Sequence, residues 1–235
     1  MNKTFGPTIF ILIIFFSSSL FLSGCIKSQP SKFYVLTPYK YGTDKYGTDK
    51  NPIDTIKGGF INKDITIGLG PVSIAKYLDR SQLVVRLTPN QIKLEDFHLW
   101  AGSPRDDIPA ILLENLTSIM GVDTIYKYPW QCHVDIDYQI VVEIIQLDGK
   151  PDESVRLVAR WEILKSSSKS NIKGVVVKSG KADFTETVAV NMVESESGVG
   201  ENLLSSNRFD SFAAAQSRAL GRLSIMIAQS LADSV

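Results

Sequence analysis

The chain has 235 residues, and its 25 basic residues balance its 25 acidic ones, which leaves a formal net charge of zero at pH 7. A nucleic-acid-binding protein would carry a basic surplus, so this composition speaks against that class. The length allows one ordinary domain or two small ones.

Residues 1–24 predict an export signal. Lys3 supplies a positive start, and an apolar stretch that contains three serines follows over residues 8–22. This stretch is shorter than the roughly 20 apolar residues that a membrane-spanning helix needs, and small residues end it, as in a signal peptide. The sequence Leu-Ser-Gly-Cys at residues 22–25 resembles the bacterial lipobox, whose cysteine is acylated and becomes the first residue of the mature chain.

Cys25 is therefore the predicted lipidation site, and no cofactor is predicted besides its covalent lipid. Two or more acyl chains give a stable membrane anchor, whereas one gives only marginal binding. The alternative is an ordinary cleaved signal with a chance cysteine. Residue 26 is Ile26 rather than the aspartate that usually retains such a lipoprotein in the inner membrane of Gram-negative bacteria. By this resemblance, the protein is expected on the outer membrane, facing the periplasm.

The segment behind the cysteine, residues 25–32, is mostly polar and predicts a short tether to a single domain over residues 33–235. Residues 32–38 predict the first strand of that domain. Residues 41–50, YGTDKYGTDK, consist of two identical five-residue segments in tandem. We interpret this pentapeptide repeat as an exposed loop lengthened by duplication, because such loops tolerate insertion at low energetic cost.

Three further segments before the first helix predict strands. Residues 63–74 alternate apolar with smaller or polar side chains. Gly68 and Gly70 in this segment indicate a bulge or the close approach of another backbone. Residues 82–87 and 91–102 predict two short strands of a hairpin, with a Pro-Asn turn between them.

A helix is predicted between Ser103 and Gly121. Ser103 can cap its first turn, Pro104 suits that turn, and Gly121 suits the residue that ends a helix. One apolar stripe is predicted to face the core, formed by Ile108, Ile111, Leu112, Leu116 and Ile119.

Residues 132–147 predict the longest strand, with apolar side chains on one face. His133, Asp135 and Asp137 lie on the other face by period-two alternation. The alternation blurs after Val141, which indicates a bulge or burial on both faces.

Asp148 and Gly149 predict the start of a turn. Residues 154–164 predict a returning strand with Arg156 and Arg160 on its polar face. In an antiparallel pair, these arginines could lie near the two aspartates of the preceding strand. Residues 174–179 and 181–191 complete the strand-rich part.

Residues 194–206 predict a loop, and residues 208–232 predict the final helix. Its buried stripe is formed by Phe212, Ala215, Ala219, Leu220, Leu223 and Ile227. The side chains expected on the solvent side are Asp210, Gln216, Arg218 and Arg222. The order of elements favours the α+β class, with a mostly antiparallel sheet of six to eight strands and two amphipathic helices packed on one face.

Several of these segments together resemble the PqiC-type lipoproteins, also called the ABC-transport auxiliary lipoprotein family. The resemblance rests on residues 97–116 (FHLWAGSPRDDIPAILLENL), 155–164 (VRLVARWEIL) and 212–228 (FAAAQSRALGRLSIMIA), together with FYVL after the tether. Family members commonly carry Trp-Ala-Glu-Pro where this chain has Trp-Ala-Gly-Ser-Pro, so any role of that carboxylate does not carry over.

The resemblance implies an accessory protein beside an MCE-type transporter that moves lipids or other hydrophobic molecules between the two membranes. The implied partners are an MCE-domain protein and an integral membrane protein of the same system. Whether the chain also forms a homo-oligomer is left undecided by the sequence. One alternative is a structural or assembly lipoprotein without lipid transport. Another is a lipid carrier with its own cavity, which the apolar stripes disfavour because they show no surplus beyond a core.

The polar residues predict neither an enzyme nor a metal site. Zinc needs three or four ligands in a tetrahedral arrangement, and His133, Asp135 and Asp137 on a flat strand would stand roughly 7 Å apart without converging. We interpret them as a solvated, ion-paired face. His98 has no evident partner and is expected to be half-exposed, and no motif for a catalytic nucleophile or a phosphate loop occurs.

The remaining candidates are three tryptophans and one thiol. Trp161 is predicted to lie in the core because of its alternation. Trp100 and Trp130 could face a partner, since aromatic side chains often dominate interface energies, although the core is the alternative for both. Cys132 has no partner for a disulfide within the mature chain, and we expect it to be buried.

Overall fold

The computed structural model describes most of the predicted domain. The described residues are 29–39, 65–122, 125–130, 134–166, 174–189 and 200–235. Side chains in the last helix are described from Arg208 onward. The predicted signal peptide, the lipidation site Cys25, the pentapeptide repeat, Cys132 and His133 lie outside the described residues.

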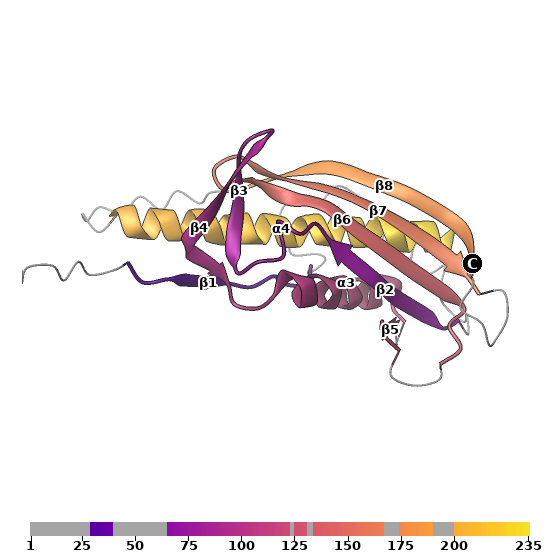
Figure 1. The fold of residues 1–235 in the computed structure, drawn as a ribbon. Coiled ribbons are helices and arrows are strands. Elements are labelled where there is room, and N and C mark those ends of the chain that lie inside the picture. The colour runs from indigo at the N-terminus through magenta and orange to yellow at the C-terminus, as the bar shows by residue number, and fades with distance from the viewer. Residues whose placement is uncertain (1–28, 40–64, 123–124, 131–133, 167–173, 190–199) are drawn as a thin grey trace, which may run out of the picture. The chain divides into compact units, whose positions relative to one another are not determined.

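The chain divides into two compact units, Met1–Pro30 and Ser31–Val235. The described part of the second unit forms eight strands in one sheet and two helices (Figure 1). The strands are β1 (Lys32–Tyr34), β2 (Ile67–Ile74), β3 (Gln82–Thr88), β4 (Gln91–Trp100), β5 (Ile125–Lys127), β6 (Tyr138–Lys150), β7 (Ser154–Lys165) and β8 (Val175–Thr187). The helices are α3 (Pro104–Met120) and α4 (Gly200–Ala232). The predicted α+β class and the predicted number of strands are confirmed.

The sheet is organised around β6, which pairs with β7 along one edge and shares its other edge between two strands. β2 runs parallel to the first half of β6, from Tyr138 to Ile144, and β3 joins it at Gly149. The order β1-β4-β3-β6-β2-β5 therefore branches at β6, with β7 and β8 beyond it. Among the described pairings, four are parallel and three antiparallel, so the sheet is mixed rather than mostly antiparallel.

The predicted bulge in the long strand is confirmed. The register of β6 against β7 shifts between Ile144 and Gln146, so that Ile145 is the extra residue. Ile144 faces the core before the bulge and Leu147 faces it afterwards. The bulge therefore moves the apolar, core-facing positions of β6 from even to odd residue numbers, which explains why the alternation in the sequence blurs there.

Helix α3 begins and ends where its local signals predict. Ser103 is extended and Gly121 is left-handed, with φ of 64°, and the amide of Gly121 donates to the carbonyl of Thr117. The Ser103 side chain makes no capping bond; its carbonyl accepts from the amides of Asp106 and Asp107 instead. Every residue of the predicted apolar stripe is buried.

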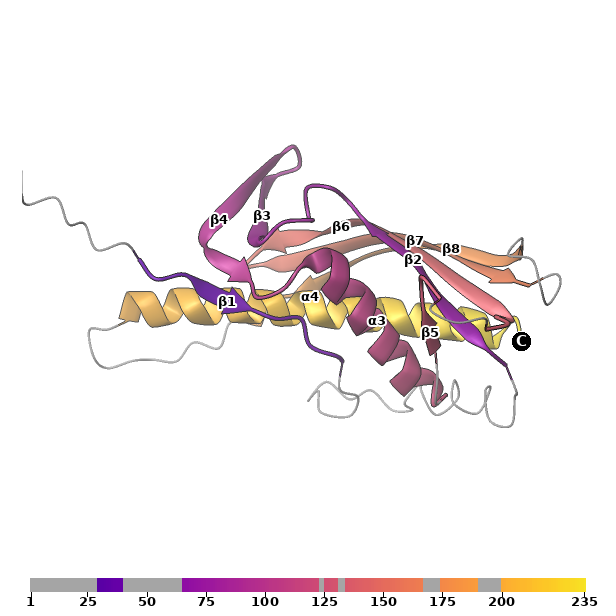
Figure 2. The same ribbon diagram turned by 60° about the horizontal axis from the view of Figure 1, so that its bottom comes forward.

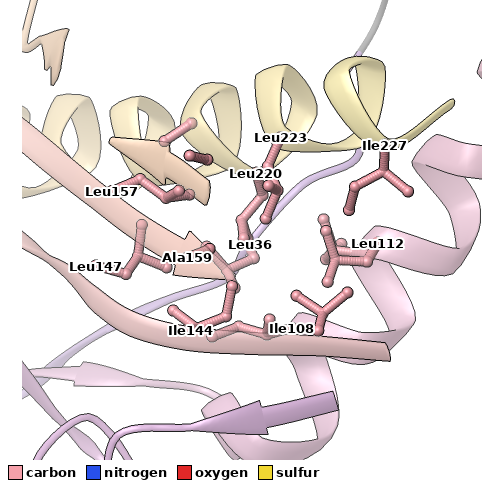
Figure 3. Close-up of a cluster of buried hydrophobic side chains, with 14 of the residues drawn as sticks. Leu36, Ile108, Leu112, Ile144, Leu147, Leu157, Ala159, Leu220, Leu223 and Ile227 are labelled. Carbon is pink, nitrogen blue, oxygen red and sulfur yellow. The ribbon is translucent and has the colours of Figure 1, made fainter. Parts of the chain in front are cut away.

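Both helices pack on the same face of the sheet (Figure 2). Figure 3 shows Leu220 of α4 and Leu112 of α3 converging with Leu147 of β6 and Leu157 of β7, and all four belong to one core cluster. Leu36, which follows β1, joins the same cluster. Within the described residues, neither helix contains an apolar run of the length and hydropathy that a membrane span requires.

The structure corrects the predicted C-terminal helix at two points. α4 begins at Gly200, so residues 200–206 belong to the helix rather than to the predicted loop. Gln216 was expected on the solvent side but is 3% exposed, and its amide donates to the carbonyl of Leu147 at 3.3 Å. The helical period predicts where the buried stripe of a helix lies but not how wide it is, so a polar residue at the edge of the stripe can be buried.

The predicted start of the long strand and its charge pairing are also wrong. β6 begins at Tyr138 rather than at residue 132, so Asp135 and Asp137 precede it. The actual register places Arg160 opposite Glu143 and Arg156 opposite Asp148. The turn occupies residues 151–153 rather than beginning at Asp148, and β6 carries an extra residue at Ile145. Both arginines therefore face residues that come later in the chain than the predicted aspartates.

Candidate functional site

In sequence, β1 is the first described strand or helix after the predicted lipidation site. β1 pairs in parallel with the end of β4, with Phe33 beside Leu99 and Tyr34 beside Trp100. Side chains alternate across this edge of the sheet. Tyr34 and Leu36 are buried, whereas Phe33 is 65% exposed and Val35 is 60% exposed. The first strand thus presents large apolar side chains to solvent.

Strand β4 extends this apolar surface. Phe97 and Leu99 flank His98, which is buried, so both lie on the opposite face of β4, the face shared with Phe33. Phe97 is 40% exposed, and Leu99 is half-buried. We call Phe33, Val35, Phe97 and Leu99 the β1–β4 patch.

A groove runs between the β1 segment and the N-terminal half of α4. Its volume is about 350 Å³. From the β1 segment it is lined by Lys32, Phe33, Tyr34, Val35 and Thr37, and from α4 by Asp210, Ala213 and Ala214. The groove therefore combines apolar side chains with one acidic and one basic residue.

Beneath the β1–β4 patch, three rings bind the first strand to the rest of the fold. The Tyr34 hydroxyl lies 2.8 Å from Nδ1 of His98, and the rings of His98 and Phe209 stack with centroids 3.8 Å apart. Burial lowers the pKa of His98 below its ordinary value of 6.5. The prediction that His98 is half-exposed and without a partner is wrong, because β1 and α4 cover it from distant parts of the sequence.

The segment after β1 is attached to both helices. The amide of Thr37 donates to Oγ of Ser217 at 3.1 Å, and the amide of Tyr39 donates to Oδ1 of Asn115 at 2.8 Å. Gly221 allows this approach, since a Cβ there would lie 2.5 Å from the Cβ of Tyr39. The chain behind the tether is thus held at several points before it leaves the described residues.

The structure does not bring Trp100 and Trp130 together. Trp100 ends β4 and is half-buried against the core. Trp130 follows β5, which pairs with β2, so it lies near the other end of the sheet order. Its ring meets Tyr128 edge-on with centroids 5.5 Å apart and covers Gly68. Gly68 is therefore a position of close approach, although a side chain approaches it and not the predicted backbone. The predicted bulge lies beside Gly70, where the register against β6 shifts between Leu69 and Val72. A partner-facing role for either tryptophan stays a prediction.

Trp161 is buried at 5% exposure, which confirms its predicted place in the core. It stands opposite Gly180 in the β7–β8 register, and a side chain at Gly180 would overlap its ring.

The polar positions before β6 have structural contacts. Asp137 accepts a hydrogen bond from the amide of Thr66 at 2.8 Å, and Asp135 is exposed. Among the described residues, no three acidic, histidine or cysteine side chains are grouped in a way that could hold a metal ion.

A buried carboxylate on β6 was missed by the sequence analysis, which placed Asp148 in a turn. Its side chain is fully buried and accepts from Nε and Nη2 of Arg86 at 2.6 and 2.7 Å. The Tyr77 hydroxyl and the Gln146 amide donate to it at 2.7 and 2.8 Å. Burial and this carboxylate raise the pKa of Tyr77, and the bonds to Asp148 raise the pKa of Arg86. Because β6 also carries Gln139, Glu143 and Gln146, one more acidic residue near its end was no distinctive signal.

The comparisons with known proteins agree with this fold. A crystal structure of an uncharacterized protein has a TM-score of 0.55 and 13% identity, and covers 86% of this chain and 99% of its own. A Xanthomonas campestris protein described by the family model DUF330 has a TM-score of 0.54 and 13% identity, with 83% and 92% covered. At this identity, the likeness shows the fold alone. No curated protein matches the chain closely.

The class of protein to which this α+β domain belongs follows from a family match over most of the chain. Residues 57–228 match the family model described as ABC-type transport auxiliary lipoprotein component. The chain belongs to this family, and it is therefore an accessory lipoprotein of ABC-type transport, anchored to a membrane of the cell envelope.

Proposed function

We propose that this chain is a PqiC-type accessory lipoprotein, anchored through Cys25 in the outer membrane and facing the periplasm. There it would dock onto or align the conduit of an MCE/ABC-type system that moves lipids between the membranes and supports envelope integrity. The observation that carries the proposal is the family match over residues 57–228. Ile26 after the lipidated cysteine supports the outer-membrane destination by resemblance to sorted lipoproteins.

The mechanism is tethering and alignment rather than catalysis. A lipid anchor confines the domain to one bilayer surface and so raises its effective concentration for a partner that reaches that membrane. The groove beside α4, at about 350 Å³, is near the lower end of the range for small-molecule pockets, roughly 300–1,000 Å³. Its lining includes Lys32 and Asp210. A groove of this size argues against storage of a whole lipid inside the domain.

Fractionation of cells that express a tagged full chain tests the proposal. We expect an acylated mature protein that begins at Cys25, sediments with the outer membrane and co-purifies with an MCE-domain protein. Cys25→Ser should lose acylation and leave the outer membrane, whereas the matched variant Cys132→Ala should keep both. An unacylated Cys25 in the exported protein, or a freely soluble protein, would contradict the anchor.

Loss of the gene separates transport from assembly. We expect reduced exchange of labelled phospholipid between the membranes, with the composition of outer-membrane proteins unchanged. Depletion of one particular outer-membrane protein, with phospholipid exchange intact, would refute the transport role and favour an assembly lipoprotein.

A further inference from the structure

The β1–β4 patch has a fixed orientation. On the buried side of this edge, Tyr34 and His98 pack against Phe209 of α4. Since neighbouring residues of a strand point to opposite faces, this packing holds Phe33 and Phe97 outward. Exposed apolar side chains that gather on one face mark an interaction surface, whereas scattered ones do not.

The position of this patch in the chain identifies its occupant. Phe33 follows Cys25 by eight residues, and a chain of that length spans at most about 26–29 Å when fully extended. The acyl chains on Cys25 therefore cannot lie farther than this from the patch. The nearest large apolar phase within that distance is the bilayer that holds those acyl chains.

A second exposed apolar group lacks this proximity and provides a comparison. Val175, Val176 and Val177 of β8 are between 40% and 63% exposed. Val175 lies beside Lys165, which pairs with Tyr138 at the start of β6. β3 joins β6 at Gly149, and β4 and β1 follow from there. Tyr138 and Gly149 are eleven residues apart in β6, which corresponds to roughly 36 Å of strand. The three valines therefore lie toward the end of β6 opposite to the one that β3 joins.

We infer that the β1–β4 patch rests on the lipid bilayer that anchors the chain, with Phe33 and Phe97 inserted at the level of the headgroups. The covalent lipid then fixes where the domain is held, and the patch fixes which face of it turns toward the membrane. An acyl anchor combined with a second membrane-binding element is a common way to obtain a defined, stable attachment. This inference rests on the lipid anchor of the proposed function but not on the identity of the transport partner.

The test places a fluorophore at the patch in the acylated protein. Phe97→Cys and, as the matched control, Val176→Cys are made in a Cys132→Ala background, so that each protein carries one free thiol. Each thiol is labelled with an environment-sensitive dye, and the protein is reconstituted into vesicles of phosphatidylethanolamine and phosphatidylglycerol. We expect the emission of the dye at position 97 to shift to shorter wavelength and to be quenched by brominated phospholipid. The dye at position 176 should show neither effect.

Phe33→Ser adds an independent check, because this exposed side chain can change without disturbing the core. It should reduce the quenching at position 97 while the near-ultraviolet circular dichroism of the domain stays unchanged. Absence of quenching at position 97, or equal quenching at positions 97 and 176, would overturn the inference. A shift at position 97 that depends on protein density and ignores brominated lipid would also overturn it, and would assign the patch to a second copy of the chain. A missing acyl group would instead appear as failure to incorporate into vesicles, which refutes the anchor and not the patch.

Discussion

Replacing Asp148 by alanine removes the carboxylate that joins three parts of the fold. Arg86 comes from β3, Tyr77 from the connection before β3, and Gln146 from β6 itself, and all of them donate to Asp148. The Asp148 side chain has no exposed area. The alanine variant therefore leaves a guanidinium, a hydroxyl and an amide without their shared acceptor.

The expected loss follows from the burial of the two charged partners. Removing one member of a buried ion pair costs about 3–5 kcal/mol of unfolding free energy. The Arg86 side chain keeps 25% of its surface exposed, so water can solvate part of the abandoned charge, and we expect the lower end, about 3 kcal/mol. For a unit of this size, such a loss lowers the unfolding midpoint by roughly 6–12 °C. Asp148→Asn, which keeps the shape and one acceptor oxygen, should lie between the wild type and alanine.

Urea unfolding followed by the fluorescence of the three tryptophans measures this loss. Asp183→Asn is the matched control, because Asp183 forms an exposed pair with Arg156, with Nε–Oδ1 at 3.0 Å, and exposed pairs contribute little. The double variant Arg86→Met/Asp148→Leu should lose less than the two single changes together, since neither charge is left alone. If Asp148→Ala unfolds at the same urea concentration as Asp183→Asn, the network does not stabilise the fold as described.

Three further changes test other parts of the fold. Gly180→Ala should cost about 1–3 kcal/mol, because the new Cβ meets the Trp161 ring; an unchanged urea midpoint together with an unchanged tryptophan spectrum would argue against this contact. Leu220→Ala should cost about 2–5 kcal/mol, since Leu220 is fully buried between α4 and the sheet, and an m-value equal to that of the wild type would show that the loss comes from the folded core. Burial lowers the pKa of His98 in the folded state, so the unfolded state takes up the proton first as pH falls below the ordinary value of 6.5. The free energy of unfolding should therefore decrease from that pH down to the folded pKa and then level off. His98→Phe should remove this pH dependence, and a variant that keeps it would assign the effect to another group.

The elements with local signals could be predicted from the sequence almost to the residue. α3 begins after Ser103 and ends before Gly121 because the cap, the proline, the stripe and the glycine all lie within one stretch of chain. The hairpin from β3 to β4 and the alternation in β7 follow for the same reason. In each case, the information that determines the structure lies within a few residues.

What could not be predicted depends on contacts between distant segments. His98 is buried because β1, 64 residues away from it, lies parallel to β4 and brings Tyr34 to its ring. The Asp148 network likewise joins residues 62 and 71 positions apart. Parallel strands are not joined by a tight turn, so no local sequence signal marks their pairing. An Asp-Gly pair is typical of a turn, and only its distant partners distinguish Asp148 from a turn residue. For these reasons, the burial of His98 and Asp148 could not be predicted from the alternation and the charge pattern alone.

The pairing of β1 has a mechanical consequence for the proposed attachment through Cys25. Any tension on the lipid reaches the domain through β1 and acts along the axis of that strand. The hydrogen bonds of this parallel pair cross the axis at a slant, so such a pull shears the contacts of β1 with β4 together instead of peeling them away one at a time. The attachments of Thr37 to α4 and of Tyr39 to α3 come next in line, and they distribute the load over both helices.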